Sequence, residues 1–229
     1  MVVGEIVEIG SFKGKSTVML GTVAKHYGLG PVVAIDPHNF NSSELLDQRS
    51  DPDSSTYSEF LSNIHNAGVS DFVEIHRACS QDVFPTWNRQ IRFLWIDGDH
   101  SYKGVKADFD GFISYVLDGG LVAFHDALHE FAGPIRVFVE DVLLSNNFGA
   151  AGFVQSIAWS QIRQRDAAWF ESERVSLERI AKRLIPFVRD GHQLTGFEKI
   201  RWKLNRSLIP RSAMRPDQWT AQLNRSEKE

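Results

Sequence analysis

Acids and histidines gather directly after two apolar stretches in the middle of this chain. Five of them follow the runs at residues 93–96 and 121–124, namely Asp97, Asp99, His100, His125 and Asp126. The carboxyl ends of neighbouring strands in an open parallel sheet meet at one edge, where such folds bind their ligands. We therefore expect these side chains to share one crevice. Carboxylates and imidazoles can bind a divalent cation there, and a neutral imidazole can take a proton near pH 7.

Apolar runs alternate with helical patterns over the first 145 residues, which is typical of a parallel sheet with crossover helices. The expected strands are Ile6–Ile9, Val32–Ile35, Phe72–Ile75, Phe93–Ile96 and Leu121–Phe124. The expected helices are Lys15–His26, one that opens at Thr56 in a capping box with Glu59, Tyr102–Val116 and Pro134–Leu144. One or two closing strands, at least one antiparallel, are expected in Gly152–Ile162. The predicted fold class is α/β, a Rossmann-like, doubly wound, mostly parallel sheet.

The pattern changes to amphipathic helix after Arg165. We divide the chain into a sheet domain, residues 1–165, and a C-terminal helical extension, residues 166–229, without stable structure from Met214 onward. The extension is expected to cover the sheet, to form a lid over the site, or to form the surface of a homodimer. The polar stretch Pro37–Ser55 is expected to be a loop that helps to cover the site.

The composition excludes several classes of protein. The single cysteine, Cys79, cannot form an internal disulfide, and neither a leader nor an apolar run of ~20 residues is visible. We therefore expect a soluble, cytoplasmic protein with no membrane partner, and Cys79 is expected to be buried. Residues 161–229 carry 15 Lys and Arg against nine Asp and Glu. This mild excess on a helical segment without a known motif does not predict nucleic-acid binding.

Gly10 and Gly14 lie between the first strand and its helix, where the main chain can approach a ligand closely and the helix amides can face it. The third spaced glycine of the dinucleotide fingerprint is missing. Three residues separate Gly10 from Gly14, where a P-loop needs four. Asp36 ends the second strand. A carboxylate at this position can accept hydrogen bonds from both hydroxyls of a ribose. Together these features favour a ligand that contains adenosine.

The combination of segments 7–14, 33–36, 95–102 and 119–126 resembles class I S-adenosylmethionine-dependent methyltransferases. More narrowly, it is similar to the bacterial metal-dependent O-methyltransferases that act on sugars of macrolides, aminocoumarins and glycans. The resemblance covers about residues 5–162. It implies transfer of a methyl group from S-adenosyl-L-methionine to a hydroxyl of a sugar or glycoside, in a small-molecule or glycan acceptor.

The resemblance also implies which residues contact the cofactor. Gly10 and Ser11 would line its methionine part, Asp36 would hold the ribose, and Ser80 would contact the adenine edge. The residues at cofactor-binding positions are Glu8, Gly10, Ser11, Gly14, Asp36, Ser80 and Asp97.

A divalent metal, expected to be Mg²⁺, would be held by Asp97, His125 and Asp126. The relatives carry an acidic pair where this chain has His125 and Asp126. The histidine departs from that pattern, because imidazole suits Zn, Ni or Fe better than Mg²⁺. A structural role for His125 in shaping the pocket is the alternative.

His100 is the candidate catalytic base, since sugar-modifying relatives use a histidine at this position and catechol-modifying relatives a lysine. Asp99 is the competing candidate for the base, and capping of the next helix is the structural alternative for His100. His38 and His129 should lie near the crevice as weaker acceptor-binding candidates.

Other functions remain open at this point. A catechol or another vicinal diol could present two oxygens to the metal as well as a sugar could. A nicotinamide-dependent oxidoreductase uses a similar sheet, but the third glycine and a Tyr-x-x-x-Lys helix are missing. A cofactor-binding module without catalysis is the last alternative.

Overall fold

The computed structural model describes residues 2–39, 56–191, 193–211 and 216–223. Its strands form one mixed seven-stranded sheet in the order β3-β2-β1-β4-β5-β7-β6, and β7 runs antiparallel to both of its neighbours. The strands are β1 (Glu5–Ile9), β2 (Val32–Ile35), β3 (Val73–His76), β4 (Ile91–Ile96), β5 (Val116–Phe124), β6 (Phe148–Val154) and β7 (Ile157–Ile162). The predicted α/β class and the antiparallel closing strand are confirmed.

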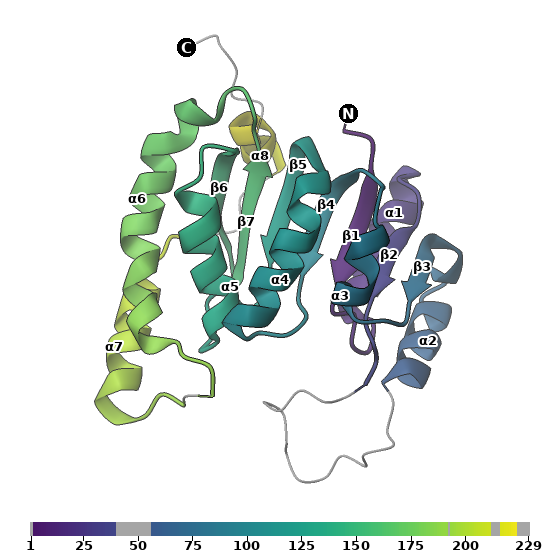
Figure 1. The fold of residues 1–229 in the computed structure, drawn as a ribbon, viewed down its shortest axis with the longest axis horizontal. Coiled ribbons are helices and arrows are strands. Elements are labelled where there is room, and N and C mark those ends of the chain that lie inside the picture. The colour runs from purple at the N-terminus through teal and green to yellow at the C-terminus, as the bar shows by residue number, and fades with distance from the viewer. Residues whose placement is uncertain (1, 40–55, 192, 212–215, 224–229) are drawn as a thin grey trace.

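Helices cover both faces of the sheet (Figure 1). They are α1 (Lys15–Tyr27), α2 (Tyr57–Asn66), α3 (Ser80–Val83), α4 (Tyr102–Phe112), α5 (Ala132–Val137), α6 (Glu171–Ala181), α7 (Gly196–Ser207) and α8 (Pro216–Leu223). Short 3₁₀ turns lie at Ser70–Phe72, Phe84–Thr86, Ile113–Tyr115, Ala167–Phe170 and Lys182–Phe187, and a π-helix continues α5 over Phe138–Leu143. Within the described residues, none of the helices combines the length and the apolar character needed to cross a membrane.

The strands read as nearly continuous apolar runs because both of their faces are buried. In β1, Val7 and Ile9 belong to the large core beneath α4 and α5, while Ile6 packs into a smaller core with Leu20 and Ala24 of α1. This alternation follows from the two-residue period of a strand. Burial on both sides fixes the register of β1, and with it the position of the loop that follows.

Several predicted boundaries and contacts were wrong. β5 begins at Val116, which we assigned to the preceding helix and which pairs with Ile91 of β4. The strand is irregular between Val116 and Leu121, where regular pairing resumes. The helix α2 is not capped by a side chain of Thr56, whose hydroxyl instead lies 3.2 Å from Nδ1 of His38. Glu59, its expected capping partner, pairs with a lysine on the glycine loop.

Cys79 is exposed rather than buried, because it precedes α3 in an extended conformation that turns the neighbouring Ser80 inward. α8 occupies part of the tail where we expected no structure. The predicted loop Pro37–Ser55 lies outside the described residues after Asn39.

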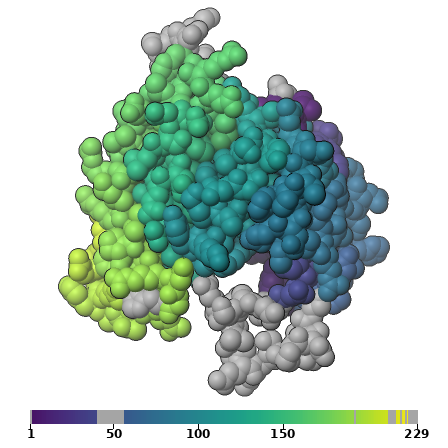
Figure 2. Space-filling view, in the orientation of Figure 1, coloured from purple at the N-terminus to yellow at the C-terminus, as the bar shows by residue number. Residues whose placement is uncertain are grey.

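The C-terminal helices share the core of the sheet domain. On the surface, their atoms lie directly against those of the sheet domain (Figure 2). Leu177 and Leu184 belong to the same buried cluster as Phe138 and Phe148. Arg174 of α6 is 2% exposed and donates hydrogen bonds to main-chain oxygens of Phe148 and, at 2.8 Å, of Ala167. Packing is therefore continuous across residue 165, and the division into two parts at that residue stays a prediction.

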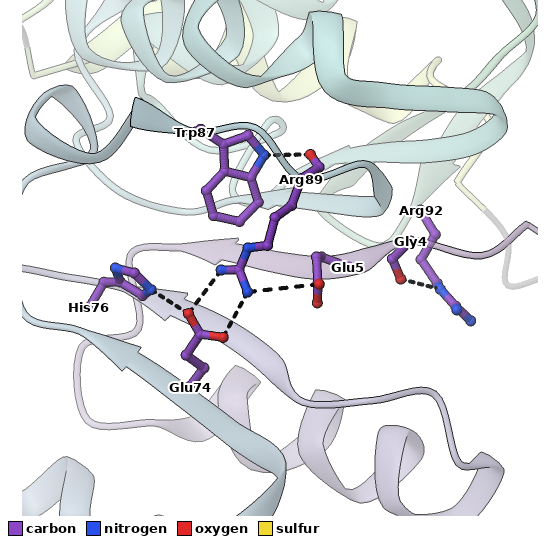
Figure 3. A network of polar contacts seen from close by, with 7 residues as sticks. All are labelled: Gly4, Glu5, Glu74, His76, Trp87, Arg89 and Arg92. Carbon is purple, nitrogen blue, oxygen red and sulfur yellow. Dashed lines mark hydrogen bonds and ion pairs between the residues drawn. The ribbon is translucent and has the colours of Figure 1, made fainter. Parts of the chain in front are cut away.

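A polar network joins β3 to the chain before β4 (Figure 3). Arg89 donates two hydrogen bonds to Glu74, at 2.8 and 2.9 Å, and its guanidinium lies 4.5 Å from the Trp87 ring. His76 lies 2.6 Å from the same carboxylate, and Glu5 lies 3.8 Å from Arg89. The hydrogen bonds from Arg89 are the largest cause that lowers the pKa of Glu74. The network holds the edge strand β3 and the start of β4 together.

The glycine after β1 permits a close approach of two loops. Gly10 has φ 87°, and a Cβ there would lie well under 3.0 Å from the main chain of Asp97 and Gly98. Gly30 has nearly the same angle, φ 84°, but no atom within 4 Å of the corresponding position. A side chain at Gly30 would meet backbone strain alone, whereas a side chain at Gly10 would meet the same strain and a steric collision.

Gly10→Ala and Gly30→Ala test this collision as a matched pair. We expect Gly30→Ala to lower the free energy of unfolding by about 1 kcal/mol, the cost of a left-handed residue with a side chain. Gly10→Ala should cost several times more, because the loops after β1 and β4 must also separate. Urea denaturation measures both values, and equal losses would show that the close approach does not constrain the fold.

Arg89→Met tests the polar network. At pH 7 we expect a loss of about 1 kcal/mol in the free energy of unfolding, since the bidentate pair is partly exposed to solvent. The folded-state pKa of Glu74 is depressed, so this contribution is complete above the unfolded-state pKa and disappears as the pH falls through the folded-state pKa. Glu59→Gln, which breaks the more exposed pair with Lys13, is the control, and a loss no larger than that of the control would refute the role of Arg89.

Candidate functional site

The carboxyl ends of β1, β4 and β5 bring the predicted site together. Main-chain hydrogen bonds continue past the strands, from Asp97 N to Ile9 O at 2.8 Å and from His125 N to Ile96 O at 3.0 Å. Each loop therefore starts beside the next, and the acidic and imidazole side chains that follow the strands project into one region. The crevice expected from the sequence forms because neighbouring parallel strands end at the same edge.

Two aspartates and two histidines form the centre of this region. Nδ1 of His125 lies 3.1 Å from Oδ1 of Asp97 and 3.1 Å from Oδ1 of Asp126. Nε2 of His100 lies 3.5 Å from Asp97 and 3.8 Å from Asp126. The carboxylate of Asp126, followed by that of Asp97, raises the pKa of His125 to about 10. In this arrangement the protonated His125 balances two half-buried acids.

Asp126 shows the strength of this coupling. Burial alone would raise the pKa of its carboxyl group, but His125, His129 and His100 together lower it. Asp126 also has φ 53°, a left-handed conformation that costs energy for a residue with a side chain. The surrounding loop thus holds Asp126 in a strained position, facing three imidazoles.

The cluster fits a divalent cation by its donor atoms. One atom each from Asp97, His100 and Asp126 lies within 4.8 Å of the others. The ring atoms His100 Nε2 and His125 Nδ1 are buried, and neither makes an aligned hydrogen bond. Two oxygens with one nitrogen suit a first-row transition metal better than Mg²⁺. This group of possible ligands thus contains two of the three predicted metal ligands, with His100 in the place expected for His125. His125 lies 3.1 Å from each carboxylate, and its role as a ligand stays a prediction.

Asp99 faces away from this cluster. Its carboxylate accepts hydrogen bonds from the Ser101 amide and hydroxyl, both at 2.8 Å. Ser101 in turn caps α4 by accepting from the Gly104 amide at 3.0 Å. The helix start is therefore capped without His100, whose ring is turned toward Asp97. The geometry favours His100 over Asp99 as the candidate base.

Phe131 is a neighbour of the site that sequence reasoning missed. Its ring stacks on that of His100, with centroids 4.4 Å apart and planes 9° from parallel. The approach of the two loops depends on Gly133, where a Cβ would lie under 3.0 Å from main-chain oxygens of His100 and Ser101. The sequence signal, an aromatic residue and a glycine after β5, is too common to have identified this contact.

Two acidic side chains, Asp36 and Glu8, hold the loop between Gly10 and Gly14 in place. Oδ2 of Asp36 accepts hydrogen bonds from the main-chain amides of Ser11 and Phe12, at 2.8 and 2.7 Å. Oδ1 accepts one from the amide of His38 at 2.6 Å. Glu8 has no exposed surface and accepts hydrogen bonds from Thr17 and, at 2.9 Å, from the Ser11 hydroxyl. Both acids therefore shape the loop, whatever else they contact.

Burial raises the pKa of Glu8 to about 7, and its Oε1 atom has no hydrogen-bond partner. Gly14 begins α1 in a left-handed conformation, φ 85°. Together with Gly10, these positions form the cradle predicted for the cofactor. Cofactor contacts at these residues stay predictions.

Ser80 lies on the far side of this cradle, buried at the start of α3. Its hydroxyl donates to the carboxylate of Asp108 on α4, and burial raises the pKa of Asp108 to about 6. A Cβ at Gly98 would lie 3.2 Å from the same acid. Sequence reasoning missed Asp108, although its place on the buried face of α4 beside Val105 was a signal.

His129 and His38, the two weaker acceptor-binding candidates, differ in their position relative to the site. His129 lies at the site, with Nε2 3.6 Å from Oδ1 of Asp126, as expected. His38 is 2% exposed, packs against the rings of Tyr57 and Phe60, and has a pKa lowered by burial. His38 is therefore part of the core, and its surface gives no basis for acceptor contact.

Comparison with known proteins agrees with this geometry. A family model described as a methyltransferase domain matches residues 7–127, just over half of the chain. An uncharacterized protein of Acanthamoeba polyphaga mimivirus is 29% identical over 123 residues, which are 52% of this chain and 50% of that protein. The chain thus spans about half the length of the curated relative it matches.

Solved structures share the fold at low identity. The O-methyltransferase NovP is 15% identical, with 70% of this chain and 72% of NovP covered and a TM-score of 0.54. The calicheamicin methyltransferase CalS11 is 17% identical, with 72% and 74% covered and a TM-score of 0.52. TomG, an O-methyltransferase from Streptomyces achromogenes solved in complex with S-adenosylmethionine, is 18% identical, with 70% and 74% covered and a TM-score of 0.50.

These likenesses establish a common fold. The resemblance read from the sequence is confirmed at the level of the family. With the strand order and the glycine cradle in place and the family model matching from β1 to the loop after β5, the chain belongs to the methyltransferase-domain family.

Proposed function

We propose that this protein is an S-adenosylmethionine-dependent O-methyltransferase that methylates a hydroxyl of a sugar or glycoside. The observation that carries the proposal is the cluster of Asp97, His100, His125 and Asp126 at the carboxyl ends of β4 and β5, beside the glycine cradle. The similar structures of NovP, an O-methyltransferase, and CalS11, a calicheamicin methyltransferase, support it.

His100 takes the proton of the acceptor hydroxyl in this proposal. Phe131 stacks on its ring, and Asp97 and Asp126 lie 3.5 and 3.8 Å from Nε2, so the ring is oriented and a positive charge on it is stabilised. S-adenosylmethionine supplies a methyl group on a positively charged sulfur, and its transfer to oxygen is one displacement in which positioning dominates.

Asp97, His125 and Asp126 are proposed to hold a divalent cation. A cation there would make an acceptor hydroxyl more acidic. Mg²⁺ is the ion expected from the carboxylates, and the imidazole in the donor set favours Mn²⁺ or Zn²⁺ as competitors.

A homodimer and a cytoplasmic location stay predictions. Light scattering measures the oligomeric state directly.

Calorimetric titration with S-adenosylmethionine tests the class of cofactor. We expect binding of S-adenosylmethionine and none of NAD, with affinity unchanged by EDTA, because the cradle around Gly10 binds the cofactor independently of the cation. The Gly30→Ala variant, altered far from the cradle, should bind as the wild type does. Binding of NAD alone, or of neither molecule, would overturn the proposal.

His100→Asn and His125→Asn separate the base from the metal ligand. We expect His100→Asn to lower kcat by about 10²- to 10⁴-fold without changing cation affinity. His125→Asn should instead weaken Mn²⁺ binding, measured by calorimetry. His26→Asn, on the exposed end of α1, is the control.

If His100→Asn weakens Mn²⁺ binding and His125→Asn does not, His100 is a cation ligand and is excluded as the base. A panel of sugars and catechols, assayed with radiolabelled cofactor, identifies the acceptor. Methylation of catechols alone would replace the sugar in this proposal by an aromatic diol.

A further inference from the structure

A pocket of about 360 Å³ lies between the loop after β5 and helix α7. Its lining comes from two segments far apart in the sequence, namely His129, Glu130, Phe131, Trp202, Lys203 and Arg206. Figure 1 shows α7 at the lower left, at the end of the molecule toward which the parallel strands point. The extension thus contributes one wall of a cavity at the functional edge of the sheet.

The pocket shares a wall with the proposed catalytic cluster. Phe131 lines the pocket and stacks on the ring of His100 at 4.4 Å. His129 also lines it and places Nε2 3.6 Å from Oδ1 of Asp126. A molecule seated in this pocket therefore lies next to the side chains that are proposed to act on the acceptor.

Two buried donors in the pocket wall have no hydrogen-bond partner within the described part of the chain. They are Nε1 of Trp202, whose residue is 3% exposed, and Nε of Arg206. Buried polar groups are nearly always paired, and neither of these groups can accept a hydrogen bond. The ring of Trp202 and the ring of Phe131 add apolar surface beside these donors. Both atoms have almost no accessible surface, so they reach a ligand only if the pocket wall moves on binding. A ligand that pairs them carries an acceptor of hydrogen bonds beside an apolar or ring-shaped part.

The charges around the pocket are mostly positive. Lys203 and Arg206 line it. Burial and the nearby charge of Arg211 lower the pKa of Arg206, and the charge of Glu130 opposes this shift only in part. Glu130, the acid in the lining, is already paired with Lys199 at 3.1 Å. An anion would relieve the repulsion between the cations and accept from the unpaired donors. A neutral ligand could satisfy the donors but would leave the charges unbalanced.

We propose that this pocket binds the anionic group of the methyl acceptor, so that the acceptor is a sugar or glycoside bearing a phosphate or a carboxylate. The inference rests on the proposed function and adds the charge of its substrate. Arg206 donates to the anionic oxygens, Trp202 Nε1 joins it once the wall moves, and Lys203 adds charge at the rim. The sugar ring reaches past the edge of Phe131 toward His100.

The test compares charged and neutral sugars on the full chain. Glucose 1-phosphate, glucuronate, inorganic phosphate and methyl glucoside are titrated calorimetrically in the presence of S-adenosylhomocysteine. We expect a charged sugar to bind at least tenfold more tightly than methyl glucoside. The phosphate and glucuronate arms decide which anionic group is preferred.

Arg206→Met should weaken binding of the charged sugar about tenfold, and Lys203→Met should weaken it less because this lysine is exposed. Both variants should leave the affinity for methyl glucoside unchanged. Trp202→Phe removes the second donor and keeps a ring. Arg201→Met is the matched control, because Arg201 is on the same helix but lies over the Phe187 ring, 5.5 Å from its centroid. Circular dichroism confirms that each variant folds.

Two outcomes would overturn the inference. One is equal binding of charged and neutral sugars, and the other is equal effects of Arg206→Met and Arg201→Met. If S-adenosylmethionine binds and either outcome occurs, the assignment of the pocket fails alone. If S-adenosylmethionine does not bind, the proposed function fails and the assignment of the acceptor fails with it.

Discussion

Gly10 must lie against the main chain of Asp97 and Gly98, because a side-chain carbon at residue 10 would collide with it. This contact follows from the pairing of β1 with β4, which continues into the hydrogen bond from Asp97 N to Ile9 O. The loop after β1 is then fixed from the other side by Asp36, whose carboxylate accepts its amides. The cradle and the acidic cluster are therefore positioned by one set of main-chain contacts, and neither can move without the other.

Charge balance explains the arrangement of the cluster. Asp97 and Asp126 lie close enough to repel each other, and His125 between them gains a proton because both carboxylates stabilise it. A cation would serve the same purpose, which is why the same side chains suit either a proton or a metal. The strained backbone at Asp126 is consistent with a position kept for its charge, since relaxing it would turn the carboxylate away.

The C-terminal helices are part of the fold and also reach the site. Arg174 joins α6 to β6 through a main-chain oxygen of Phe148, and Leu177 of α6 with Leu184 of the next turn completes the core beneath β5 and β7. From that anchor α7 extends to the loop that carries Phe131 and His129. The helix has two faces, one with Trp202 turned inward and one with Phe197, Ile200 and Leu204 exposed. The inward face contributes Trp202 to the pocket wall.

The sequence by itself determined the fold class, the glycine cradle and the meeting of Asp97, His100, His125 and Asp126. Each depends on local patterns and on one general property, that adjacent parallel strands end at the same edge. Only the tertiary structure decided the direction of individual side chains. Ser101 draws Asp99 away from the cluster, and Phe131 packs on the adjacent His100.

Only the tertiary structure also decided the contacts between distant segments. Asp108 reaches Ser80 across two helices, α7 closes a pocket against the loop after β5, and Cys79 turns outward. These outcomes depend on how whole elements pack, because a side chain's partners are set by the three-dimensional positions of neighbouring elements. Spacing along the chain does not record those positions.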